Sequence, residues 1–120
     1  MKLVITKFLF LMTTRLFAKE IVYFDYQNSL MTLTKIRNGY INESCFEKKC
    51  MAMNVIDKKI SIKKLNIEGG RNPGAVACKT IHQGKIIMLK RIETNQLSSF
   101  CLFNDGSYIS TGIINSSITN

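Results

Sequence analysis

Residues 72–107 read NPGAVACKTIHQGKIIMLKRIETNQLSSFCLFNDGS, and this stretch decides the fold of the chain. Asn72 is a good N-cap, and Pro73 suits the first position of a helix. The residues that follow, as far as His82, favour a short helix that ends at Gln83-Gly84, with Gly84 as its C-terminal stop. The stretch therefore opens with one short, well-delimited helix.

The second part of the same stretch predicts strands. Residues 85–93 and 98–104 are rich in strand-forming side chains. Asp105-Gly106 is typical of a hairpin turn, and residues 107–114 are expected to return as a third strand. The C-terminal half of the chain is thus predicted to be a helix followed by a three-stranded antiparallel meander.

Working outward, the N-terminal half is also β-rich. Residues 21–26 and 30–36 are expected to be strands, and Asn38-Gly39 is a strong turn signal. Residues 40–53 give no clear secondary structure, and residues 60–67 suggest a strand whose polar face carries lysines. We predict an α+β fold in which a short helix packs on a small antiparallel β-sheet, tied by disulfides. The expected organisation is a signal peptide at 1–18, a β-rich segment at 19–67, and the helix-plus-meander unit at 68–120.

The four cysteines are Cys45, Cys50, Cys78 and Cys101, an even number that an oxidising compartment would pair. Three connectivities are possible. The short spacing between Cys45 and Cys50 favours a local bridge, which leaves Cys78 to pair with Cys101 and to hold the helix on the middle strand of the meander. This pairing is preferred over the two crossed ones.

The first eighteen residues follow the pattern of a secretory signal. Lys2 opens a short apolar stretch, and Ala18 precedes a polar segment at a suitable cleavage position. The segment is too short and too charged to span a bilayer, which takes roughly 20 apolar residues. The alternative is an amphipathic first helix of a cytosolic protein.

The chain is basic, with a net charge of +9. Without residues 1–18, 14 basic and 8 acidic residues leave a net charge of +6. This balance favours anionic partners. However, the lysines are dispersed in pairs, as at Lys58-Lys59 and Lys63-Lys64, which is more typical of a solubilising surface than of a nucleic-acid interface.

Three motifs lie in order between Gly69 and Gly112: Gly69-Gly70-Arg71-Asn72-Pro73-Gly74-Ala75-Val76-Ala77-Cys78, then Gly84-Lys85, then Phe100-Cys101-Leu102-Phe103-Asn104-Asp105-Gly106-Ser107. With these motifs the region resembles a small bacterial envelope domain, number 333 in the series of domains of unknown function and labelled as a haemolysin type. It implies an exported module and establishes no activity. Residues 108–112 lack the further Cys of the family, so the resemblance does not extend to the second family disulfide.

Catalytic and metal sites are less favoured than packing roles. His82 follows Cys78 by four residues, a spacing that could pair a thiolate with a base, but no third orienting group is evident. Cys45, Cys50, Cys78 and His82 could instead supply a tetrahedral zinc site, which would leave Cys101 over. The disulfide interpretation uses all four cysteines and agrees with the signal segment. We therefore expect no metal, no cofactor and no enzyme activity.

The sequence assigns no binding residues, but it does favour one class of protein. We expect a periplasmic or secreted binding module, such as an inhibitor of a hydrolase or an envelope-interaction protein. Its partner would be a protein or an envelope component, with no strong case for nucleic acid and no transmembrane span. The alternative is a cytosolic, zinc-bearing nucleic-acid-binding protein.

Overall fold

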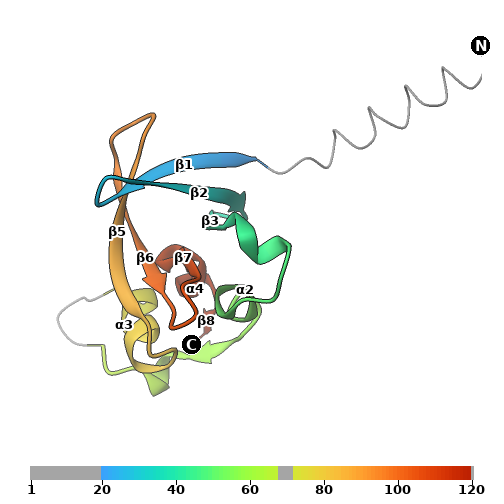
Figure 1. Ribbon diagram of the computed structural model, residues 1–120. Coiled ribbons are helices and arrows are strands. Elements are labelled where there is room, and N and C mark those ends of the chain that lie inside the picture. Colours follow the sequence, from blue (N-terminus) through green and yellow to red (C-terminus); the bar gives the residue numbers. More distant parts are fainter. Residues whose placement is uncertain (1–19, 68–71, 120) are drawn as a thin grey trace, which may run out of the picture.

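The computed structural model describes residues 20–67 and 72–119 (Figure 1). The expected signal peptide at 1–18 and the Gly69-Gly70-Arg71 part of the family motif lie outside the described residues. No helix in the described part of the chain is long and apolar enough to cross a membrane. The elements, in chain order, are β1 (Ile21–Tyr26), β2 (Ser29–Ile36), β3 (Gly39–Asn42), the 3-10 helix η1 (Glu43–Phe46), α2 (Met51–Asn54), β4 (Ile60–Ser61), the 3-10 helix η2 (Ile62–Lys64), α3 (Pro73–Thr80), β5 (Lys85–Arg91), β6 (Leu97–Leu102), β7 (Tyr108–Ser110), α4 (Thr111–Ser116) and β8 (Ile118–Thr119).

Six antiparallel strands close into a barrel in the order β1-β2-β3-β7-β6-β5. The barrel closes where β1 pairs with β5, through Phe24 opposite Arg91 and Asp25 opposite Lys90. On the other side, β3 meets β7 at Ile41 and Ile109. Both halves of the chain therefore contribute strands to one sheet. The α+β class and the small antiparallel sheet are confirmed, and the closure of that sheet goes beyond the open meander expected from the sequence.

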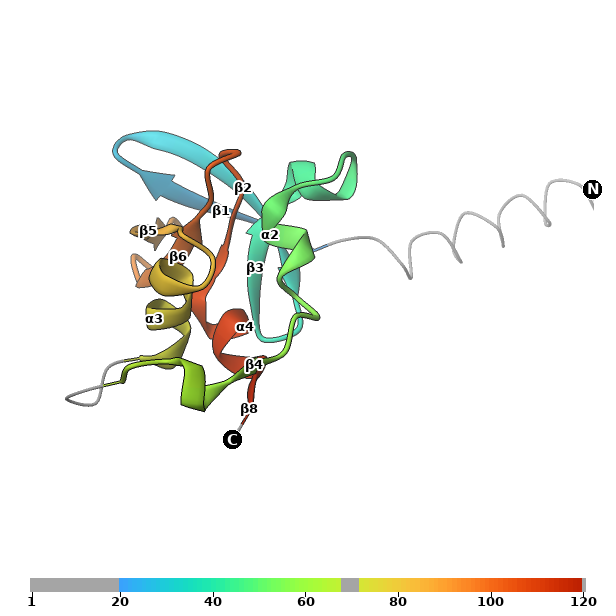
Figure 2. The same cartoon turned by 90° about the horizontal axis from the view of Figure 1, so that it is seen from below.

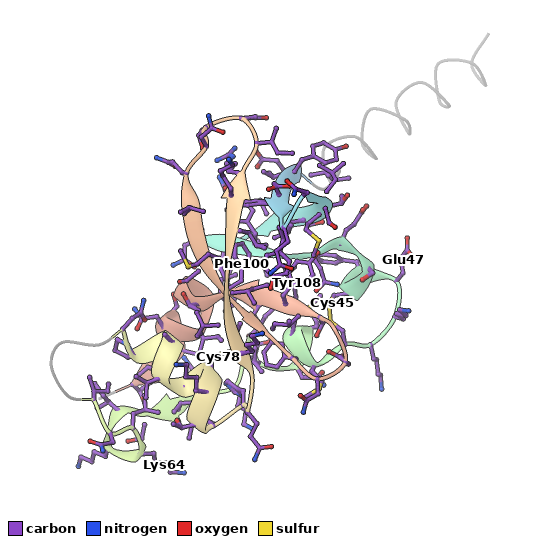
Figure 3. The ribbon with its side chains drawn as sticks, turned by 60° about the vertical axis from the view of Figure 1, so that its left-hand side comes forward. Cys45, Glu47, Lys64, Cys78, Phe100 and Tyr108 are labelled. Carbon is purple, nitrogen blue, oxygen red and sulfur yellow. A yellow bond between two sulfur atoms is a disulfide. The ribbon has the colours of Figure 1, made fainter. Side chains whose placement is uncertain are left out.

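The barrel interior is one of two hydrophobic cores. Alternate residues of each strand point inward, and Phe24, Leu33, Leu89 and Phe100 are fully buried there. The ring of Phe24 packs edge-on against those of Phe100, at 5.5 Å, and Tyr40, at 5.2 Å. Figure 3 shows Phe100 and Tyr108 close to where the strands cross. Aromatic side chains from sequentially distant strands thus fill the centre of the barrel.

The second core lies outside the barrel, between the β3–β7–β6 wall and the helices. Ile41, Cys101 and Ile109 point outward from these strands and pack with buried residues of α2, α3 and α4. Figures 1 and 2 show β1 and β2 on the side of the molecule away from α3 and α4. One wall of the barrel is therefore covered by helices, whereas no helix within residues 20–67 and 72–119 covers the wall around β1.

Several predicted elements are confirmed. Strands occur where they were expected, as β1, β2, β5 and β6, with ends shifted by at most a few residues. Helix α3 begins at Pro73, and the Asn72 side chain accepts hydrogen bonds from the N–H groups of Gly74, at 2.8 Å, and Ala75, at 3.4 Å. Gly106 has a φ of 85°, as the predicted Asp-Gly turn requires.

Two predicted strands are present but shorter than expected, and burial explains both. At residues 60–67 only β4 is a strand, because Ile60 and Leu65 both enter the outer core, and an odd spacing would send them to opposite faces of a strand. At 107–114 the strand ends at Ser110 and α4 follows. Ile113 and Ile114 are adjacent in sequence and both are buried in the same core, which a helix allows and a strand does not.

Two predicted turns are displaced by one residue. The turn between β2 and β3 lies at Arg37-Asn38, with Arg37 at a φ of 47°, and Gly39 is already the first residue of β3. After α3, the left-handed residue is Gln83, with a φ of 54°, and not Gly84. Gly84 is therefore not needed for a left-handed backbone; a side chain at this position would instead collide with the neighbouring disulfide.

Candidate functional site

The two disulfides hold elements that are far apart in sequence or that lack a regular structure. Cys78 on α3 bonds to Cys101 on β6, with their Cα atoms 5.7 Å apart, and so fixes the helix to the outside of the barrel. Cys45 bonds to Cys50 and closes the loop between η1 and α2. Figure 3 labels Cys45 and Cys78. This is the pairing that the cysteine spacing favoured.

The Asp105-Gly106-Ser107 turn has a structural role beyond its own hairpin. Asp105 Oδ2 accepts a hydrogen bond from the N–H of Met51 at 2.8 Å, and Ser107 Oγ accepts one from the N–H of Ala52 at 3.0 Å. These are the first two N–H groups of α2, which have no partner within the helix. The turn therefore caps α2 and holds it against the barrel.

Hydrogen bonds also set the charge of this turn. Burial by itself would raise the pKa of Asp105. The hydrogen bonds from the Ser107 side chain and from the backbone N–H groups of Met51 and Ser107 outweigh that effect, and together they lower the pKa of the carboxyl group below its ordinary value. Asp105 is consequently a structural carboxylate, which is how the sequence interpretation treated this turn.

His82 does not form a nucleophilic pair with Cys78, because that sulfur is bonded to Cys101. Its ring lies edge-on to Phe103, with ring centres 6.0 Å apart, and no residue in the described part of the chain bonds its buried Nε2. Burial lowers the pKa of His82, and the charge of Lys58 lowers it further. The imidazole is thus held neutral at the edge of the outer core, in the wall of a mostly apolar pocket of about 230 Å3.

The zinc arrangement expected from the alternative interpretation uses sulfurs that the structure places in disulfides. Within residues 20–67 and 72–119, no group of three or more His, Cys, Asp or Glu side chains is arranged to hold a metal ion. The four cysteines and His82 lie around the outer core.

The most distinctive surface of the described residues is the wall of the barrel that none of their helices covers. Of the eight large apolar side chains that are exposed in the described part of the chain, six lie on this wall. Leu30 and Leu97 are each 64% exposed, and Tyr23 is 50% exposed. We call the large apolar and charged side chains that face outward on this wall the uncovered barrel face; they are Ile21, Tyr23, Asp25, Leu30, Met88, Lys90, Ile92 and Leu97.

Strand register arranges this face in rows. Leu30 of β2 lies opposite Asp25 of β1, Asp25 lies opposite Lys90 of β5, and Lys90 lies opposite Leu97 of β6. Residues that lie opposite one another in a sheet share a face, so these four side chains form one row across four strands. In the next row, the N–H of Ile92 donates to the carbonyl of Tyr23 at 3.1 Å, which places these two side chains together.

The sequence carries a signal for this face. Residues 21–24 of β1 read IVYF, so both faces of that strand are apolar. A strand with solvent on one face normally alternates apolar and polar side chains. A continuous apolar run on a strand whose outer face no described helix covers indicates that this face is also a contact surface.

Comparisons with known proteins identify no relative of this chain. A scan against protein-family models, a search of curated proteins and a search of solved structures each found no match. Function must therefore be inferred from the geometry of the molecule itself.

Proposed function

We propose that this protein is an exported, disulfide-tied module that binds a partner protein through the uncovered barrel face. The observation that carries the proposal is the gathering of apolar side chains on the one wall that the helices leave open. A contiguous exposed apolar patch is typical of an interaction site, whereas isolated exposed apolar residues are common on any protein. Tyr23 adds the type of side chain that most often anchors an interface.

The composition of the face favours a protein over an anionic polymer or membrane. Its charged residues are a single Asp25 and a single Lys90, so the face itself is neutral. Nucleic acids and acidic lipid surfaces are bound by concentrated positive charge. The exposed lysine pairs of this chain lie elsewhere, at 48–49, 58–59 and 63–64, around α2 and η2.

The closed barrel supports recognition by side chains. A partner that adds a strand needs a long unpaired sheet edge, and the barrel closes the edges of its sheet on each other. The disulfides and the second core make this a rigid scaffold, and a rigid surface loses little entropy on binding. These features suit an inhibitor or an envelope-interaction protein.

Two observations support export to the periplasm or beyond. Both cysteine pairs are bonded, and disulfides of this structural kind persist in oxidising compartments. Residues 1–18 follow the signal pattern, and the resemblance to an exported envelope domain points to the same compartment. Catalysis is not part of the proposal.

A site-specific photo-crosslinking experiment tests this function. A photoreactive amino acid is placed at position 97, on the uncovered barrel face, and separately at position 63, on the lysine-bearing side. Both variants are expressed in the source organism and the extracytoplasmic fraction is irradiated. We expect a discrete protein adduct from position 97 and none from position 63. Retention of the chain in the cytosol, or equal diffuse labelling from both positions, would contradict the proposal.

A further inference from the structure

The row of Leu30, Asp25, Lys90 and Leu97 is complementary to the same row read in the opposite order, since apolar residues then meet apolar residues and each charge meets the opposite charge. Consider a two-fold axis that runs parallel to the strands, outside the barrel and above the line between β1 and β5. Rotation about this axis would place a second copy of the face against the first, with the order of the row inverted. Asp25 of each copy would then face Lys90 of the other, and Leu30 would face Leu97. The order of the four residues is given by the register of β2, β1, β5 and β6.

The same two-fold rotation also pairs the residues of the neighbouring row. Tyr23 and Ile92 lie on either side of the same axis, so that Tyr23 of one copy would contact Ile92 of the other. Strands in a sheet are about 4.8 Å apart, so, measured across the strands, Asp25 and Lys90 each lie about 2.4 Å to one side of the axis, and Leu30 and Leu97 about 7 Å to one side. Because a barrel wall is convex, the residues nearest the axis make the closest contacts, and they are the charged pair, Tyr23 and Ile92.

Asp25 and Lys90 are available for such contacts. The ion pairs found in the described residues join Arg37 to Asp57 and Arg91 to Glu93, and neither includes Asp25 or Lys90. Two opposite charges at the centre of an apolar patch would weaken binding to a purely apolar partner, because both would be desolvated with only each other as compensation. They strengthen binding to a surface that presents the opposite charges in the inverted order, and a second copy does so.

We propose that the uncovered barrel face forms a two-fold symmetric homodimer, with Asp25 of each copy paired with Lys90 of the other. This inference rests on the proposed function, because it names the partner of the same surface. Symmetric dimers are the most common oligomers and require a patch that is complementary to itself. The convex wall limits the contact area, so we expect a dissociation constant on the order of 1–100 µM.

A charge exchange tests the pairing by sedimentation equilibrium of the oxidised protein. Asp25→Lys alone and Lys90→Asp alone each place like charges in contact, and each is expected to weaken dimerisation by at least about 10-fold. An equimolar mixture of the two variants restores both opposite-charge pairs and is expected to form a heterodimer within about 3-fold of the wild-type affinity. Lys63→Asp, outside the face, serves as the control and should dimerise like the wild type.

The outcomes separate the two proposals. A wild-type protein that stays monomeric up to about 1 mM, or a mixture that associates no better than the single variants, overturns the dimer. If position 97 still crosslinks to a different protein in that case, the binding function stands and only its partner changes. If position 97 crosslinks to no protein, including a second copy, both proposals fail. Circular dichroism of each variant confirms that a loss of association is not a loss of folding.

Discussion

Gly84 lies directly against the disulfide that joins Cys101 to α3. A Cβ atom at position 84 would be 2.5 Å from Cys101 Sγ and 3.0 Å from Cys78 Sγ, and also 3.0 Å from the carbonyl oxygen of Leu102. Side-chain carbons do not approach other atoms so closely without displacement. Glycine is thus required where the chain passes from the helix into β5, because the disulfide occupies the space that a side chain would need.

Replacing Gly84 by alanine should therefore strain the helix–barrel junction. We expect Gly84→Ala to lower the free energy of unfolding by about 1–3 kcal/mol, as overpacking does elsewhere. Gly112→Ala is the matched control, since a Cβ there would have no neighbour within 4 Å. Urea unfolding should show the control to be neutral or stabilised by up to about 1 kcal/mol. Equal behaviour of the two variants would argue against the close approach at Gly84.

The two disulfides should contribute unequally to stability. Cys78–Cys101 closes a loop of 23 residues and Cys45–Cys50 one of 5. The chain-entropy relation gives roughly 3 kcal/mol for the longer loop and about 2 kcal/mol for the shorter one. Thermal melts of the Cys78→Ser/Cys101→Ser and Cys45→Ser/Cys50→Ser proteins test the order. A larger loss from opening Cys45–Cys50 would contradict the central role given to the α3–β6 bridge.

Asp105→Asn should weaken the cap on α2. The amide cannot reproduce the charge-assisted bonds to Met51 and Ser107, and we expect a loss of about 1 kcal/mol at pH 7. The pKa of Asp105 is lowered in the folded protein, so its contribution is present above the unfolded pKa and disappears as the pH falls through the folded pKa. The difference between wild type and Asp105→Asn in urea unfolding should thus vanish in acid. The neighbouring Asn104→Ala variant should show no such pH dependence.

His82 should titrate below its ordinary pKa of 6.5 when the ring resonances are followed by NMR. Burial is the larger cause and Lys58 the smaller, so Lys58→Ala should move the pKa only part of the way back. Because the folded-state pKa is lowered, the unfolded chain binds the proton more readily, and stability should fall as the pH drops from the unfolded towards the folded pKa. A pKa at or above 6.5 would show that the ring is not buried against Phe103.

Local signals account for the parts of the fold that the sequence predicts. Asn72 and Pro73 define the start of α3 through capping chemistry that involves neighbouring residues only. The short spacing of Cys45 and Cys50 makes their pairing local, and that pairing leaves one partner for each remaining cysteine. Strands such as β1 and β6 follow from runs of strand-forming side chains.

The parts that could not be predicted depend on contacts between distant residues. Barrel closure rests on the few pairs between β1 and β5 and on Ile41 opposite Ile109, and no local pattern encodes them. Helix α4 has the composition of a strand. It forms because its backbone packs against α3 at Gly74, where a Cβ would overlap the carbonyl oxygen of Thr111. The apolar run at residues 21–24 indicates that both faces of β1 make contacts, but which wall of the barrel stays uncovered depends on where the helices pack.

We expect the side chains of the uncovered barrel face to serve binding and to contribute little to folding. The most direct measurement is the free energy of unfolding of a Tyr23→Thr/Ile92→Thr/Leu97→Thr protein in dilute solution, compared with wild type and with Leu89→Ala from the barrel interior. Threonine suits a strand, so we predict a change within about 1 kcal/mol for the triple variant and a loss of about 2–5 kcal/mol for Leu89→Ala. A loss in the triple variant as large as that of Leu89→Ala would show that these side chains stabilise the barrel, and would contradict the claim.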